Sequence, residues 1–251
     1  MYLVDLTPIR YADKSSGLYS DRRYGRILYI KSEGMIPVDI SIRRLVELIG
    51  IDSPIYFTEK DKLNRENYFY FQPMGEAEVE AIRNKNHNPQ CEYDPAGIGL
   101  HLPDITAAEY LELENSRNPV GIESIINLIS QQMIAFVVEY PILLATFSVL
   151  HEYGHWVHYI NSGKSSYEYA MTETNERKPY EKIAREIKAL DDWDPHKIIL
   201  GRRYHNEIYS QFTSEKFANK YAMEHFAEAI EKVRAVIGYT EQDLLEMPIY
   251  E

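Results

Sequence analysis

The sequence predicts an α+β protein in which a small β-sheet, formed within the first hundred or so residues, packs on a helical core. Short aromatic and β-branched runs bounded by Pro, Gly and Asn cluster before residue 105, and they indicate strands. Apolar residues at helical spacing dominate afterwards. The 251-residue length and the hydrophobic content of 45% allow one domain with a sizeable core, and no internal repeat divides the chain.

The first elements alternate between irregular structure, one helix and short strands. Residues 1–35 form an N-terminal extension in which "GRILYIKSEGM" is a candidate hairpin. Next, "IPVDISIRRLVELIGI" predicts a short amphipathic helix, since Ser41 can cap its start and Gly50 can end it. The apolar residues at helical spacing are Ile42, Leu45, Val46 and Ile49. Three strands are expected in "SPIYFTEK", "NYFYFQP" and "AGIGLHLPD", and residues 84–95 read as a loop.

Helices dominate the second half of the chain. A first helix is expected in "GIESIINLISQQMIAFVVEY", and a second opens at Pro141, because proline suits the first turn of a helix. Residues 161–203 form a polar insertion with one expected helix, "PYEKIAREIKALDDW". A last long helix is expected from about Tyr209 to Ile237, with Gly238 as its C-terminal stop.

Charge and composition exclude several classes of protein. A formal net charge of −12 disfavours direct binding to nucleic acid, which depends on basic residues that neutralise phosphates. A single cysteine, Cys91, cannot form an internal disulfide and fits a reducing compartment. The N-terminus lacks the pattern of a secretory signal, and polar residues interrupt the apolar region 121–160 before it could cross a bilayer. We therefore expect a cytoplasmic protein with no membrane partner.

The segment "TFSVLHEYGHWVHYI", residues 146–160, places histidines and a glutamate inside an otherwise apolar helix. Its "HEYGH" pattern has the form HExxH, and residues four apart on a helix share a face, so His151 and His155 can present their imidazoles to one metal ion. Glu152 is then expected to act as the general base that takes the proton of the attacking water. A zinc ion would explain the buried imidazoles, because it binds their lone pairs.

His158 lies on the same helical face but is not predicted to be a ligand. At 1.5 Å per residue it is about 10 Å along the axis from His151, whereas Zn–N bonds are about 2.0 Å long. We expect it to be hydrogen-bonded or partly exposed at the end of the helix. Because an HExxH pattern can arise by chance, the alternative is a set of metal-free core histidines, which predicts no zinc in elemental analysis.

The third ligand is expected from the last helix, in "TSEKFANKYAMEHF". Glu215 would complete a His, His, Glu site for zinc, and Asn219 can hydrogen-bond a ligating histidine and fix its tautomer. Apolar residues share the helical face of Glu215, so its side chain should point at the core; they are Phe212, Ala218, Ala222 and Phe226. Small alanines on this face allow close helix approach. The alternatives for the third ligand are His205 and Glu207.

Four stretches in the same order resemble the ImmA/IrrE family of zinc-dependent metallopeptidases. "IPVDISIRRLVELIGI" is similar to the N-terminal helix of that family, and "AGIGLHLP" to the edge strand before its catalytic helices. "TFSVLHEYGHWVH" is similar to its active helix, and "EKFANKYA" to its Glu-x-x-Ala-Asn-x-Phe-Ala element. The resemblance implies a single zincin-like, gluzincin-type domain over residues 1–251, with a small mixed or antiparallel sheet packed on the helical core that carries HExxH.

The resemblance also implies roles for individual residues. His151, His155 and Glu215 would be the zinc ligands and Glu152 the catalytic base, in agreement with the assignment from the residues alone. The chain departs from the family in its longer connection between His155 and Glu215, so residues 161–203 are extra and can shape specificity. The metzincin subclass is excluded, because it needs glycine at position 158 and histidine at position 161.

The sequence therefore predicts a zinc-dependent endopeptidase, and by resemblance its substrate is an intracellular protein such as a regulator or repressor. The alternative is a non-catalytic, zinc-containing regulatory or protein-binding module. His205, Tyr204 and Tyr209 are candidate donors to the transition-state oxyanion, and the sequence does not choose among them. A DNA-binding helix-turn-helix around "SIRRLVELIGID" is disfavoured, because "SPIYFTEK" reads as a strand and the chain is acidic.

Overall fold

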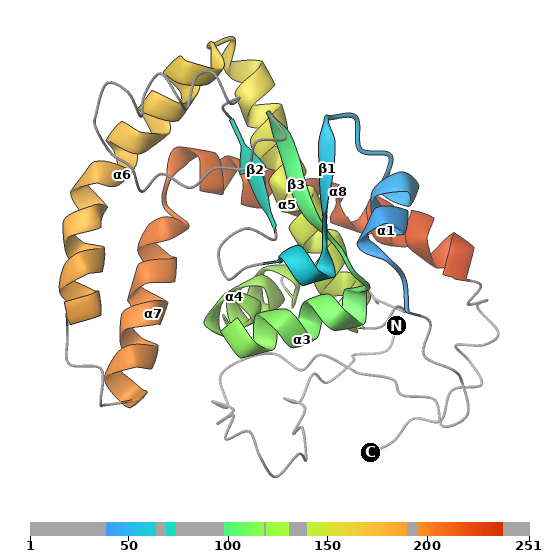
Figure 1. Ribbon diagram of the computed structural model, residues 1–251, viewed down its shortest axis with the longest axis horizontal. Coiled ribbons are helices and arrows are strands. Elements are labelled where there is room, and N and C mark those ends of the chain that lie inside the picture. The colour runs from blue at the N-terminus through green and yellow to red at the C-terminus, as the bar shows by residue number, and fades with distance from the viewer. Residues whose placement is uncertain are drawn as a thin grey trace, which may run out of the picture.

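Helices surround one small sheet in this computed structural model, which describes residues 39–63, 69–73, 98–117, 119–130, 140–189 and 195–237 (Figure 1). The strands are β1 (Ile55–Glu59), β2 (Tyr70–Gln72) and β3 (Gly99–Asp104). The α-helices are α1 (Ile42–Ile49), α3 (Ala107–Arg117), α4 (Pro119–Ser130), α5 (Tyr140–Ser162), α6 (Ser166–Ala189), α7 (Pro195–Tyr209) and α8 (Thr213–Ile237), and a 3₁₀ turn follows β1 at Lys60–Lys62. The candidate hairpin, the loop at 84–95 and Gly238 lie outside the described residues.

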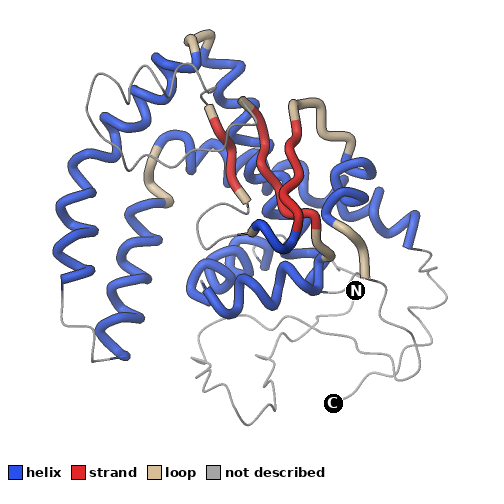
Figure 2. The backbone as a smooth tube through the Cα atoms, in the orientation of Figure 1, coloured by secondary structure: helices blue, strands red, loops and turns tan. Residues whose placement is uncertain are grey.

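The three predicted strands are present and form a mixed sheet in the order β1-β3-β2 (Figure 2). β1 runs parallel to β3, with Phe57 opposite Leu102, and β2 runs antiparallel to β3, with Phe71 opposite Leu100. β3 is therefore the central strand of the described sheet, and its expected likeness to an edge strand is wrong. The central position of β3 agrees with its burial. Every residue from Gly99 to Pro103 is buried, as in a strand covered on both faces.

The expected amphipathic helix is confirmed as α1. The Ser41 hydroxyl oxygen accepts a hydrogen bond from the backbone N–H of Arg44, which caps the N-terminus. Gly50 adopts the left-handed conformation, with φ 81°, and its N–H donates to the Val46 carbonyl, which ends the helix. The four apolar residues predicted for its stripe, Ile42, Leu45, Val46 and Ile49, are all buried. The segment after it, 55–59, is strand β1, so a recognition helix does not follow α1.

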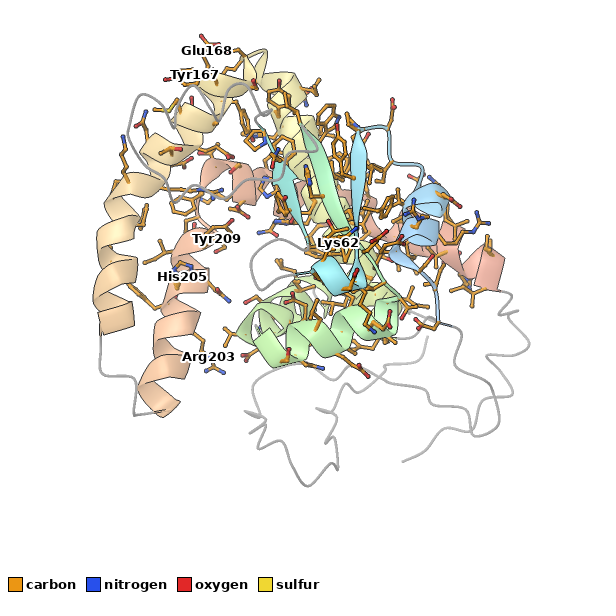
Figure 3. The ribbon with its side chains drawn as sticks, viewed as in Figure 1. Lys62, Tyr167, Glu168, Arg203, His205 and Tyr209 are labelled. Atoms are coloured by element: carbon orange, nitrogen blue, oxygen red, sulfur yellow. The ribbon has the colours of Figure 1, made fainter. Side chains whose placement is uncertain are left out.

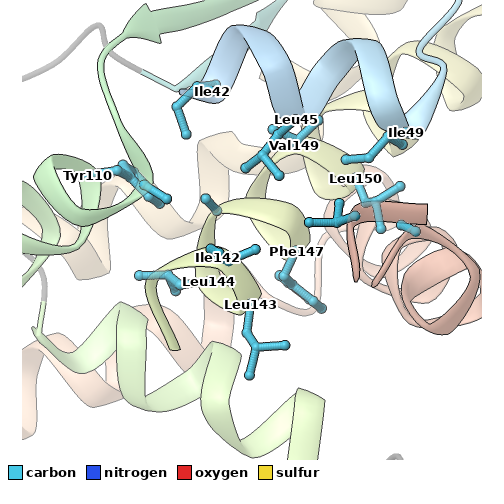
Figure 4. Close-up of a cluster of buried hydrophobic side chains, with 14 of the residues drawn as sticks. Ile42, Leu45, Ile49, Tyr110, Ile142, Leu143, Leu144, Phe147, Val149 and Leu150 are labelled. Carbon is cyan, nitrogen blue, oxygen red and sulfur yellow. The ribbon is translucent and has the colours of Figure 1, made fainter. Parts of the chain in front are cut away.

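The core lies where α5 meets α1, α8 and the sheet. Residues 142–150 of α5 are buried without interruption, which explains why this helix is apolar around its whole circumference. Figure 4 shows Leu45 and Ile49 of α1 beside Val149 and Leu150 of α5. Within the described part of the chain, no helix is both long and apolar enough to cross a membrane.

Two helices, α6 and α3, start where the sequence predicts no helix start. Each of them begins with a capping box. α6 begins at Ser166, well before the expected helix at 179–193, and it continues through Pro179. At its start, the backbone N–H of Ser165 donates to Glu168, and the N–H of Glu168 donates to the Ser165 hydroxyl. α3 was not expected and starts with the same reciprocal pair, between Thr106 and Glu109.

The boundaries of the other helices agree in part with the expected ones. α5 starts at Tyr140, so Pro141 lies in its first turn as predicted. α4 covers Pro119–Ser130, and residues 131–139 of the expected helix lie outside the described residues. The predicted insertion contains the start of a second long helix, α7, so the last expected helix begins at Thr213 instead of Tyr209. α6 and α7 lie side by side at one end of the molecule (Figure 1).

Candidate metal centre

His151 and His155 face Glu215 because helices α5 and α8 approach each other closely. The two histidines lie one turn apart on α5, and Glu215 lies in the first turn of α8. A Cβ atom placed on Gly154 would come within 2.8 Å of the Ala218 Cα atom. Glycine and alanine at this crossing therefore allow the backbones to approach, and the side chains on either side can meet.

The three side chains present their donor atoms at the spacing of a tetrahedral zinc site. The Nε2 atoms of His151 and His155 are 3.2 Å apart, and the Glu215 Oε2 atom lies 3.3 Å and 3.5 Å from them, respectively. Bonds of about 2.0–2.1 Å at tetrahedral angles separate adjacent ligand atoms by about 3.3–3.4 Å. All three observed separations are close to this value, so the group could hold a metal ion.

His151 is held by Asn219, one turn beyond Glu215 on α8. Its Nδ1 atom lies 3.0 Å from the amide oxygen of Asn219. That oxygen can only accept, so the contact requires the proton on Nδ1 and leaves the lone pair of Nε2 directed at Glu215 and His155. The predicted hydrogen bond is thus present, and it orients the histidine as a metal ligand requires.

The electrostatics of the group couple Glu215 to both imidazoles. Burial alone would raise the pKa of Glu215, but His155 and the hydrogen bonds to the two histidines hold that pKa well below its ordinary value. Burial alone would lower the pKa of His155, whereas the Glu215 carboxylate raises it to above its ordinary value. The charged form of a buried carboxylate is favoured at this position, which suits a ligand for a cation.

Glu152 lies beside the group, between α5 and the sheet. The backbone of Phe71 in β2 is near enough to act on its carboxylate. Burial raises the pKa of Glu152, and the neighbouring His151 and His155 oppose that rise. A carboxylate with a raised pKa is a better proton acceptor than an exposed one, so the surroundings of Glu152 suit a general base.

The predicted insertion at 161–203 contributes two side chains of α6 that the sequence did not single out. Nη2 of Arg177, on α6, lies 3.2 Å from Oε1 of Glu215, the oxygen that faces away from the imidazoles. Glu173, one turn earlier, lies 4.0 Å from the same guanidinium nitrogen. Tyr209 at the end of α7, one of the three candidate oxyanion donors, also lies near this carboxylate, and burial together with Glu215 raises the pKa of its hydroxyl. Tyr169, Glu173 and Arg177 are four residues apart, so they share one face of a helix. That face can be recognised in the sequence only if the helix is expected to start before Tyr169.

The other candidates are not brought to the group. His158 lies outside it and pairs with the Tyr169 hydroxyl, 2.7 Å from its Nδ1 atom, as expected for a hydrogen-bonded residue at the end of the helix. The alternative third ligands, His205 and Glu207, are exposed on α7. Figure 3 labels His205 and Tyr209 along α7. Among the three candidate oxyanion donors, Tyr209 is the one whose pKa is raised by Glu215, after the larger effect of burial.

Comparison of the chain with protein-family models, with curated proteins and with solved structures finds no match. What the chain does is therefore inferred from the chemistry of the residues that meet between α5 and α8. A buried His151, His155 and Glu215 group that could hold a metal ion is the feature on which that inference rests.

Proposed function

We propose that the chain is a zinc-dependent endopeptidase with a zincin-like fold. The observation that carries the proposal is the set of three donor separations, 3.2, 3.3 and 3.5 Å, which suit one tetrahedral zinc ion. Two imidazoles and one carboxylate are the protein ligands of catalytic zinc sites that leave a position open for water. The position of Glu152 beside this set favours a catalytic over a structural ion.

Each residue of the centre has a role in this proposal. A bound zinc ion would lower the pKa of a water molecule and polarise the carbonyl of a peptide bond. His151, His155 and Glu215 hold the ion, and Asn219 fixes the tautomer of His151. The Glu152 carboxylate accepts the proton of the attacking water and passes it to the leaving amine. Tyr209 is the proposed donor to the developing oxyanion, since Glu215 is near enough to its hydroxyl to raise the pKa that burial already raises.

The substrate class follows from the resemblance of the HExxH helix and the "EKFANKYA" segment to the ImmA/IrrE family. By that resemblance the substrate is an intracellular protein, such as a regulator or repressor. The net charge of −12 is consistent with a protein substrate and disfavours direct contact with nucleic acid. No other partner is proposed.

The substitution Glu152→Gln tests the proposal. It removes the proton acceptor while it keeps the size of the side chain and the zinc ligands. We expect one zinc per chain in both proteins, and cleavage of a fluorescence-quenched peptide library to fall by about 10²–10⁴-fold in the variant. The matched control is Glu207→Gln, which changes an exposed glutamate on α7 and should leave cleavage unchanged.

Two results would argue against peptidase activity. Purified protein without zinc would point to metal-free core histidines. A zinc-loaded wild type that cleaves no peptide, and whose function in any other assay is insensitive to Glu152→Gln, would point to a non-catalytic zinc-containing module.

A further inference from the structure

The carboxylate of Glu215 is contacted on both of its oxygens, and the two sets of partners come from different parts of the chain. Its Oε2 atom faces the imidazoles of α5. Its Oε1 atom lies 3.2 Å from Nη2 of Arg177 on α6. The side chain of Glu215 is 3% exposed and that of Arg177 is 36% exposed, so the contact between them is shielded from water on the carboxylate side. An interaction between a buried carboxylate and a guanidinium is stronger than one on the surface.

Arg177 is itself held in place by neighbouring groups. Its guanidinium lies 5.2 Å from the ring centroid of Tyr209 and 5.6 Å from that of Phe212. Glu173, one turn earlier on α6, is 4.0 Å away. Aromatic rings and a second carboxylate restrict the rotamers of a long side chain, so the guanidinium presents a fixed donor to Glu215.

We propose that Arg177 is a positioning residue of the metal centre, which holds Glu215 so that a single oxygen faces the ion. The proposal rests on the zinc site of the proposed function, but not on peptidase activity. In this proposal α6 contributes a residue that orients a metal ligand, in addition to packing against α5 and α7. A zinc ligand from α8 would then be oriented by a residue that the expected family pattern does not contain.

The sign of the effect separates positioning from simple electrostatics. A guanidinium near the site repels a cation, so if charge alone mattered, its removal would tighten zinc binding. If Arg177 positions the carboxylate, its removal frees Oε1, and Glu215 can rotate or bind the ion through both oxygens. Loss of a group that orients a ligand typically weakens metal affinity about 10–100-fold. The two roles therefore predict changes in opposite directions.

The test compares Arg177→Met, Arg177→Lys and the wild type. Zinc affinity is measured by competition with a chromophoric chelator, and the coordination is followed by the visible absorbance of the Co(II)-substituted proteins. We expect Arg177→Met to bind zinc about 10–100-fold more weakly. Its molar Co(II) absorbance should be lower, because a second carboxylate oxygen raises the coordination number. Arg177→Lys keeps the positive charge but loses the planar guanidinium, so its zinc affinity should lie between those of the wild type and Arg177→Met.

The matched control is Arg203→Met. Arg203 lies on α7, and its Nη2 atom is 3.1 Å from Oε1 of Glu123 on α4, so it ties the same pair of helices to the rest of the protein without contact to Glu215. We expect its zinc affinity and Co(II) spectrum to match those of the wild type. An equal loss in this control would assign the effect to docking of the helices and would overturn the positioning role.

The remaining outcomes are equally decisive. Unchanged or tighter zinc binding by Arg177→Met, with an unaltered Co(II) spectrum, overturns the inference and leaves the proposed function standing. A wild-type protein that binds no zinc overturns both. If Arg177→Met does not fold, Arg177→Lys decides: a weaker zinc affinity supports the positioning role, and an affinity and a Co(II) spectrum equal to those of the wild type overturn it.

Discussion

The imidazole of His158 lies beyond the candidate ligands on α5, and its Nδ1 atom lies 2.7 Å from the Tyr169 hydroxyl. Burial lowers the pKa of His158 below its ordinary value of 6.5. The charged or titratable groups that act on it are Glu173 and Glu176, which raise the pKa, and His155 and Lys164, which lower it. The fold therefore favours the neutral ring, while the unfolded chain binds the proton more readily.

This difference predicts a pH-dependent term in stability. Relative to neutral pH, the free energy of unfolding should fall as the pH drops through 6.5 towards the lowered pKa of the folded state. We expect His158→Gln, which does not titrate, to show a shallower fall over the same range. The pH dependence of the free energy of unfolding is measured by urea unfolding of both proteins at several pH values in the presence of a chelator. Parallel curves for the wild type and the variant would contradict the assignment.

The residues of the candidate site differ in how far the sequence could predict them. His151, Glu152 and His155 share one helical turn, and Glu215 and Asn219 share another, so local spacing indicated both sets. Arg177 shares only a four-residue spacing with Glu173 on α6, and that spacing does not indicate Glu215, because the contact depends on where α6 returns to the core. Charged residues on a polar helix usually face solvent, and only the packed structure separates this arginine from the others.

The crossing of α5 and α8 depends on Gly154, and its substitution tests the packing of these two elements. A Cβ at this position would lie 2.8 Å from the Ala218 Cα atom, 3.0 Å from the Ala218 carbonyl oxygen and 3.1 Å from the Tyr221 Cβ atom. Two of these atoms belong to the backbone, so one of the helices would have to shift. The donor atoms on either side of the crossing would move apart with it.

We therefore expect Gly154→Ala to destabilise the protein by about 1–3 kcal/mol, the usual cost of overpacking. Helix propensity acts in the opposite direction, because alanine is favoured over glycine by about 1 kcal/mol within a helix. Denaturant unfolding gives the sign. Stability that is unchanged or increased in the variant would show that the helices do not approach as closely as the distances indicate.

Among the elements, those with complete local signals were predicted best. α1 carries its own N-cap, apolar stripe and terminal glycine, and the three strands are bounded by turn residues. α6 was expected too late because Pro179 resembles a first-turn proline, although the capping box at Ser165 and Glu168 lies much earlier. α6 continues through Pro179, which is exposed, against the usual preference that excludes proline from the interior of a helix. The central position of β3 is also a tertiary property, which no single strand encodes.

At the level of the whole molecule, the metal centre joins parts of the chain that are far apart in sequence. α5 provides two of the candidate ligands, α8 provides the third, and α6 contacts that third residue through Arg177. β2 reaches the same place through Phe71, whose ring centroid lies 6.4 Å from that of His155. An ion bound here would therefore link α5 to α8 in the folded state only, since the unfolded chain does not bring the donors together.

Metal removal should accordingly lower the stability of the entire fold. Zinc at a free concentration of 100 times its dissociation constant should raise the free energy of unfolding by about 2.7 kcal/mol over the chelated protein. Calorimetry with zinc and with a chelator measures this difference. Glu215→Gln should reduce the response strongly, because it removes a charged ligand, whereas Glu207→Gln on the exposed face of α7 should keep it. Equal unfolding temperatures with zinc and with chelator would mean that no ion links the two helices, and the distances between the imidazoles and Glu215 would then describe an ordinary buried ion pair.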